Sequence, residues 1–253
     1  MCKYKKVIKD IMNCPNIKDI YNGGKNDCAE IVNFQRDKNV KLEDFKGPEA
    51  WNGQLYKSKI LVISSNPGIG DEEIIPTMKW KLAKAIDFYQ DRFTSKKIWV
   101  NNLSGLKKNG TYGNKVQNWT QTKNRIEYLF DEKSEIGTDY TLLELVHCKS
   151  ANEKGVYRAI KECADRYFEK TMKISPSKVL IITGDIAIDF ICVKYSIQKK
   201  TANRGYGLYN PISIGGKDRI IIFLPHTNYF GKRKAEYFID KNDKTQINRF
   251  FKQ

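Results

Sequence analysis

The chain has 253 residues, and 45 Lys and Arg against 29 Asp and Glu give it a formal net charge of +16. Its length suits one full hydrophobic core, and its 40% hydrophobic and 12% aromatic residues are typical of a globular protein. No apolar run approaches the roughly 20 residues that a membrane-spanning helix needs, and no apolar segment typical of a secretion signal follows the charged first residues. We therefore expect a cytoplasmic protein with no membrane partner and no obligate protein partner.

An excess of basic residues this large favours a polyanionic partner such as DNA, because Lys and Arg release counterions when they approach phosphates. The alternative is a Lys-rich proteome encoded by an AT-rich genome, in which lysines cover solvated surfaces. Six cysteines are scattered along the chain without a Cys-x-x-Cys pair. In a cytosolic chain we expect these cysteines to be reduced thiols rather than disulfides.

Residues 1–50 are polar and broken by Gly and Pro, and we interpret them as an N-terminal extension with two short helices. The apolar run at residues 59–65 predicts a buried strand that ends in the turn Asn66-Pro67-Gly68. Another short apolar run lies at residues 98–100. Strands are further predicted at residues 141–147, 178–183 and 219–224, and helices at 76–92, 125–130, 156–172, 186–193 and in the basic tail.

Strands that are apolar throughout and alternate with helices predict an α/β fold, with a mainly parallel sheet covered on both faces. The chain contains no repeat or convincing linker, so we expect one domain over residues 1–253. In such sheets the functional residues gather at the carboxyl ends of the strands. That rule selects four places: residues 66–68, 144–148, 184–185 and 226–228.

All four places are similar to parts of one known family, and the helix that reaches Cys163 and the strand that leads to Gly184 continue the match between the motifs. The turn Ser65-Asn66-Pro67-Gly68 is similar to an Asn-Pro-Gly water-activating motif, residues 143–150 resemble the strand and loop that carry a base-reading Asn and then a Cys, and residues 224–228 resemble a His-Pro-Ser motif. In this order, over residues 59–234, they resemble the uracil-DNA glycosylase superfamily, with features of its mismatch-specific, single-strand-selective and iron–sulfur branches. The resemblance implies a three-layer α/β/α fold and hydrolytic removal of a base that is flipped out of DNA.

The resemblance gives Asn66 the role of holding the attacking water. An amide orients water but cannot take its proton at neutral pH, so stabilisation of the leaving base has to carry most of the catalysis. The same resemblance makes His226 the donor to the base oxygen on which negative charge develops. The alternatives are a turn residue that caps its own backbone for Asn66 and a packed or surface histidine for His226.

Pro67, Gly68 and Trp80 are the expected base pocket. Gly68 stands where the uracil-restricted branch has a Tyr that excludes substituents at C5 of the pyrimidine, so the resemblance implies acceptance of thymine or larger groups. The alternative is a glycine that simply permits the turn. Trp80 stands where the family places the aromatic ring that stacks on the flipped base, with partial burial at a helix start as the alternative.

Glu144 departs from the family, whose base-reading residue is Asn. Here an acid lies in an apolar strand, and a buried carboxyl tends to have a raised pKa. When ionised it accepts from an exocyclic amino group, and when protonated it donates to N3, so both forms suit cytosine better than uracil. The alternative is an ion pair with one of the many lysines.

The segment after His226 combines aromatic residues with a basic run, which fits a wedge that fills the gap left by the flipped base and then contacts phosphates. We expect Asn228, Tyr229, Phe230, Lys232, Arg233 and Lys234 to contact DNA, with a solvated basic helix start as the alternative.

No metal or cofactor is expected. Cys148 and Cys163 match two of the four ligands of the iron–sulfur branch. Cys14 and Cys28, however, are too far apart in the sequence to resemble its other pair, and Cys163 on an apolar stripe needs no metal.

These residues predict a monofunctional DNA glycosylase for a C5-substituted cytosine. By analogy with family members that defend bacteria, the base is glucosylated hydroxymethylcytosine of phage DNA. No catalytic Lys belongs to the matched motifs, so lyase activity is not implied. Two alternatives stay open: a repair glycosylase for uracil or mismatched thymine, and a catalytically silent DNA-binding module in which Asn66 and His226 are structural.

Overall fold

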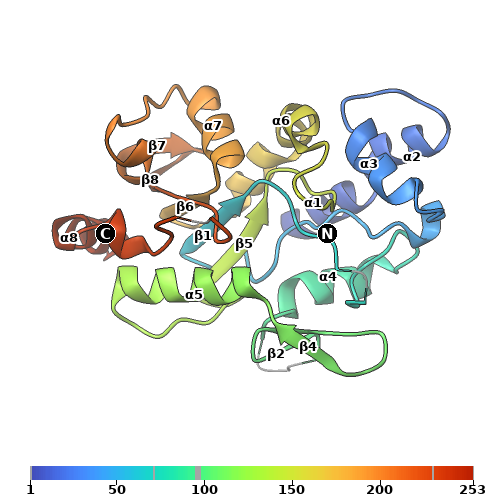
Figure 1. Ribbon diagram of the computed structural model, residues 1–253, viewed down its shortest axis with the longest axis horizontal. Helices are drawn as coiled ribbons and strands as arrows, with labels where there is room; N and C mark the ends of the chain where they lie inside the picture. The colour runs from blue at the N-terminus through green and yellow to red at the C-terminus, as the bar shows by residue number, and fades with distance from the viewer. Residues whose placement is uncertain (1, 71, 95–97, 230, 253) are drawn as a thin grey trace.

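A five-stranded sheet forms the centre of the computed structural model, which describes residues 2–70, 72–94, 98–229 and 231–252 (Figure 1). The strand order is β5-β1-β6-β8-β7, and only β7 runs antiparallel to its neighbour. The strands are β1 (Ile60–Ser64), β5 (Tyr140–Glu144), β6 (Val179–Thr183), β7 (Gly207–Ile214) and β8 (Lys217–Leu224). The expected α/β class with a mainly parallel sheet is confirmed.

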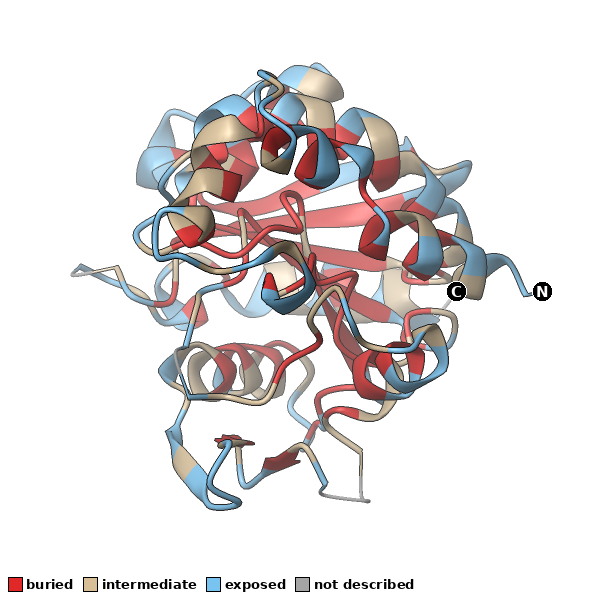
Figure 2. Cartoon of the chain, turned by 90° about the vertical axis from the view of Figure 1, so that its right-hand side faces the viewer, coloured by how far each residue is buried: buried red, intermediate tan, exposed pale blue. Residues whose placement is uncertain are grey.

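Alternate residues of each central strand pack into two separate cores, because successive side chains point to opposite faces. On one face, Ile63 packs with α6 (Val156–Ile174), whose apolar stripe is buried as predicted, and with α7 (Asp185–Lys194). On the other face, Val62 packs with α5 (Gln117–Phe130) and α8 (Lys241–Lys252). The result is a three-layer α/β/α fold, and Figure 2 shows the buried strands between helices whose outer faces are exposed.

The first fifty residues differ from the expected extension, because they pack into the same core as the sheet. They form three helices, α1 (Lys3–Met12), α2 (Pro15–Tyr21) and α3 (Ala29–Arg36), followed by the short η1 (Leu42–Asp44). Ile8, Ile11 and Ile17 are at most 1% exposed and belong to the cluster that contains α6. The apolar residues of α1 recur at helical spacing and pack into the core, although Gly and Pro residues interrupt the sequence of residues 1–50.

A second, three-stranded antiparallel sheet was not predicted. It consists of β2 (Val100–Asn101), β3 (Ser104–Leu106) and β4 (Tyr112–Lys115), and it lies between α4 (Leu82–Asp91) and α5 in the chain (Figure 1). Two further short helices, η2 (Ala202–Gly205) and η3 (Ala235–Tyr237), flank β7 and β8. Among the residues that the structure describes, no helix is both long and apolar enough to cross a membrane.

Candidate active site

A cavity of about 560 Å³ opens at the carboxyl edge of the central sheet. Three of the four places selected from the sequence line it. Asn66, Pro67 and Gly68 follow β1, Glu144 ends β5, and His226 follows β8. Parallel strands bring their carboxyl ends to one edge, so residues 160 positions apart in the chain meet in one cavity. The fourth place, residues 184–185, lies beside His226, since a Cβ added to Gly184 would lie 3.5 Å from the His226 ring.

Asn66 is held by two hydrogen bonds from its side-chain nitrogen. Nδ2 donates to the Pro67 carbonyl oxygen at 3.0 Å and to Ser150 Oγ at 3.1 Å. Both bonds use the NH₂ group, and Oδ1 makes no hydrogen bond within the described part of the chain. The turn therefore leaves an acceptor at the cavity that can orient a water.

His226 has a defined tautomer. Its Nδ1 accepts a hydrogen bond from the backbone N–H of Asn228 at 3.2 Å, so the proton of the neutral ring lies on Nε2. Burial lowers the pKa of His226 below its ordinary value; Glu153 opposes this shift and Arg125 adds to it. The ring is therefore neutral at neutral pH and presents one N–H donor.

Glu144 keeps an unpaired buried oxygen. Its Oε2 has no hydrogen-bond partner among the described residues. Burial raises the pKa of Glu144 well above its ordinary value, Glu49 and Glu153 raise it further, and Lys149 opposes them. The protonated form is therefore favoured, and an O–H donor lines the cavity.

Lys149 does not neutralise Glu144, because it pairs with a different carboxylate. The buried Lys149 ammonium forms an ion pair with the buried Glu49. Arg92 lies on the other side of Glu49 at 3.2 Å and also binds Glu73 at 2.5 Å. Burial alone would raise the pKa of Glu49, but Lys149 and Arg92 outweigh it and lower this pKa to about 2. The expected alternative of a Glu144–Lys ion pair therefore has no counterpart in the described structure.

Trp80 does not belong to the cavity lining, which corrects its expected place in the base pocket. Its ring packs against Phe88 and Trp99, with centroid distances of 5.9 and 5.7 Å, and Lys84 lies 4.0 Å above it. Trp119 of α5 lines the cavity instead. It is 7% exposed, and the Arg92 guanidinium lies 5.0 Å from its ring centroid.

The residues expected to contact DNA have mixed surroundings. Asn228 lines the cavity, whereas Tyr229 accepts a hydrogen bond from Arg204. Lys232 and Lys234 are exposed, and Lys234 pairs with Glu236 at 3.2 Å. Arg233 is half-buried, with its carbonyl oxygen bound by Arg125, while Phe230 lies outside the described residues. Both lysines therefore reach solvent, although Lys234 would have to exchange Glu236 for a phosphate.

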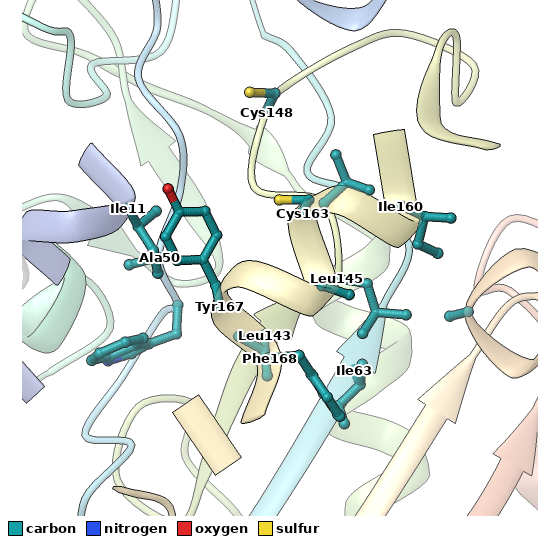
Figure 3. Packing of buried hydrophobic residues seen from close by; sticks show 14 of the residues in the cluster. Ile11, Ala50, Ile63, Leu143, Leu145, Cys148, Ile160, Cys163, Tyr167 and Phe168 are labelled. Carbon is teal, nitrogen blue, oxygen red and sulfur yellow. The ribbon is translucent and has the colours of Figure 1, made fainter. Parts of the chain in front are cut away.

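Four buried cysteines from distant parts of the chain line a second, small cavity. Cys14 and Cys28 precede the first turns of α2 and α3, Cys148 follows β5, and Cys163 lies on α6. Figure 3 shows the Cys148 and Cys163 sulfur atoms pointing the same way. Burial and the neighbouring Cys14 raise the pKa of Cys28 to about 11, although its hydrogen bond with Asn16 opposes them.

Four cysteines in one cavity match the number of ligands that an iron–sulfur cluster takes. No set of three His, Cys, Asp or Glu residues in the described ranges is arranged to hold one metal ion. A cluster instead spreads four thiolates around an inorganic core, and four cysteines are its usual ligand set. The distance between Cys14 and Cys28 in the sequence argued against a cluster. In the fold, α2 packs against α3 and both cysteines line the same cavity.

Several lining residues were not identified from the sequence, among them Glu49, Arg92, Trp119 and Glu153. Arg92 carried a usable signal, because it continues the spacing of the buried Ala85, Phe88 and Tyr89 on α4. A charged residue in an apolar helical stripe needs a buried partner.

No protein-family model matches this chain, and no curated protein is significantly similar to it.

Proposed function

We propose that this chain is a monofunctional DNA glycosylase that flips out a C5-substituted cytosine and hydrolyses its N-glycosidic bond. The observation that carries the proposal is the meeting of Asn66, Glu144 and His226 in one cavity. They provide a water-orienting amide, a neutral carboxyl and a neutral imidazole. The net charge of +16 supports DNA as the partner.

The chemistry of the reaction matches this set of groups. Breaking the bond between C1′ and the base produces an oxocarbenium-like sugar and a base with growing negative charge. Glu144 in its protonated form donates to N3 of the departing cytosine, and His226 Nε2–H donates to its O2. Asn66 Oδ1 orients the water that attacks C1′. The product is an abasic site, and no Lys is required to form a covalent intermediate.

The shape of the cavity favours a substituted base. A Cβ added to Gly68 would meet no atom within 4 Å, so the space beside this turn is open. The volume of about 560 Å³ lies in the range that holds drug-sized ligands and exceeds the need of a pyrimidine alone. Arg92, Glu73 and Asn52 line the same cavity, and Arg92 Nε has no hydrogen-bond partner among the described residues. Such a wall suits a hydroxyl-rich substituent, as in glucosylated hydroxymethylcytosine of phage DNA.

Filling the space beside Gly68 should change the substrate preference. We expect Gly68→Leu to lower the excision rate of glucosylated hydroxymethylcytosine roughly a hundredfold more than that of unsubstituted cytosine. The leucine side chain would occupy the volume that the C5 group needs. The rates are measured under single-turnover conditions on duplexes that differ in one base.

Gly68→Ala is the matched control, because one methyl group fits the open space and should change the ratio of the two rates by less than about threefold. If Gly68→Leu slows both substrates equally, Gly68 serves only the turn and the C5-accepting function is wrong.

We further propose that Cys14, Cys28, Cys148 and Cys163 hold an iron–sulfur cluster. When bound, the cluster would supply a structural cross-link rather than chemistry at the DNA base, because its four ligands join α2 and α3 to β5 and α6. Protein purified without oxygen should contain about four iron and four acid-labile sulfide atoms per chain. Cys148→Ser should lose both and unfold at a lower temperature.

Cys192→Ser is the control, since Cys192 is also buried but does not line this cavity. Its iron content should equal that of the parent. Absence of iron and sulfide after anaerobic reconstitution, together with equal melting temperatures of the two variants, would show that the four thiols are ordinary core residues.

A further inference from the structure

The proposed reaction lacks one group, because the Asn66 amide can orient the attacking water but cannot take its proton. We infer that Glu153 is the general base that accepts this proton. The inference rests on the proposed glycosylase function and adds a catalytic residue that no motif of the chain identifies.

Glu153 is linked directly to the turn that carries Asn66. Its Oε1 accepts a hydrogen bond from Ser65 Oγ, and Ser65 immediately precedes Asn66. Both Ser65 and Glu153 line the cavity with Asn66. The Ser65 hydroxyl thus fixes one carboxylate oxygen beside the turn, and Oε2 remains to receive a proton from the water.

The backbone around Glu153 is forced into an unusual conformation. Asn152 and Glu153 have φ angles of 51° and 55°, in the left-handed region that residues with a Cβ rarely adopt. The end of this loop packs closely against α3. A Cβ added to Gly155 would lie 2.5 Å from the backbone nitrogen of Ile31, so a larger residue does not fit there. Two other pairs of consecutive residues, Asn102–Leu103 and Asn203–Arg204, share this conformation, so it sets the shape of the turn that presents Glu153 and does not by itself mark a site.

The charge of Glu153 reaches both of the other ionisable groups of the site. It raises the pKa of Glu144 and opposes the burial that lowers the pKa of His226. Burial and the neighbouring acids favour the protonated form of Glu144, whereas Glu153 is exposed to solvent. One acid and one base that flank a scissile glycosidic bond are the arrangement that inverting glycosidases use.

The step balances with these two carboxyl groups. The C1′–N1 bond breaks with its electron pair on the base, and the Glu144 proton neutralises the base at N3. The water oxygen bonds to C1′, and its proton passes to Glu153. The products are the neutral base, the abasic sugar, a Glu144 carboxylate and a protonated Glu153, and proton exchange with solvent restores both side chains.

The test compares Glu153→Gln, Glu153→Asp and Glu153→Ala in single-turnover excision with protein in saturating excess. Loss of a general base should lower the rate by about a hundredfold or more in Glu153→Gln and Glu153→Ala, with Glu153→Asp in between. Added formate should restore part of the rate of Glu153→Ala, because it can take the same proton, and should not restore Asn66→Ala. DNA affinity should change less than about threefold.

Lys154→Ala is the control for damage to the loop, since Lys154 is the exposed neighbour of Glu153 and does not line the cavity. Its rate should stay within about threefold of the parent. An equally fast Glu153→Gln, or a Glu153→Ala that formate does not rescue, would overturn the role of Glu153 while the glycosylase function stands. Absence of base release by both the parent and Lys154→Ala would overturn the function itself.

Discussion

Asn66→Ala and His226→Ala are each expected to lower the single-turnover rate of base release by about a hundredfold or more, with DNA affinity nearly kept. Asn66→Ala removes the Oδ1 that orients water, and His226→Ala removes the Nε2–H that stabilises negative charge on the base. Quenched time courses of abasic-site formation measure the rate, and fluorescence anisotropy with labelled DNA measures the affinity.

Asn109→Ala, at an exposed asparagine outside the cavity, is the matched control and should keep the parent rate. Rates within a few-fold of the parent for both site variants would remove Asn66 and His226 from the mechanism. They would favour the alternative of a silent DNA-binding module.

Glu144→Gln is expected to reduce excision of a C5-substituted cytosine by about a hundredfold or more. Cytosine is a poorer leaving group than uracil, because its anion lacks the second carbonyl, and a glutamine cannot transfer a proton to N3. Glu144→Asn should shift the preference toward uracil, since Asn is the base-reading residue of the family that the sequence resembles. Rates on uracil, thymine and C5-substituted cytosine, measured for all three proteins, test both statements.

The same carboxyl sets the sign of the pH dependence. Burial raises the pKa of Glu144 well above its ordinary value, so the acid keeps its proton to a higher pH than an exposed carboxyl and loses it as the pH rises through that raised value. Excision by the parent should therefore fall on the alkaline side, and Glu144→Gln should lose this fall. His226 is already neutral at neutral pH, because burial lowers its pKa, and it adds no alkaline limb. A parent rate that rises across the alkaline range would contradict the role of Glu144 as the acid.

The predicted strands were correct where burial alone decides the structure. Residues 59–65 and 178–183 are continuous apolar runs, and both are parallel strands whose residues are buried on both faces. β7 was missed because its middle is exposed around Asn210 and Pro211, so its pattern does not read as a buried strand. The small sheet was missed because the exposed β4 contributes little to an apolar core.

The strand-end rule found Asn66, Glu144 and His226 because their position depends only on the sheet. It could not find Glu49, Arg92 or Glu153, which come from a loop, a helix end and a strained turn. These are brought to the cavity by tertiary packing. Cys14 and Cys28 show the same limit, since the packing of two short helices, rather than their spacing in the sequence, makes them neighbours.

The central claim is that the protein releases a C5-substituted cytosine from DNA, and the released base can be measured directly by mass spectrometry. Duplexes that carry cytosine, hydroxymethylcytosine, glucosylated hydroxymethylcytosine, uracil or thymine at one position are incubated with the parent protein and with Asn66→Ala. We predict that the parent releases the glucosylated base fastest, leaves an uncleaved abasic site, and loses this activity in Asn66→Ala. Fastest release of uracil or thymine, or no free base from any duplex, would contradict the account.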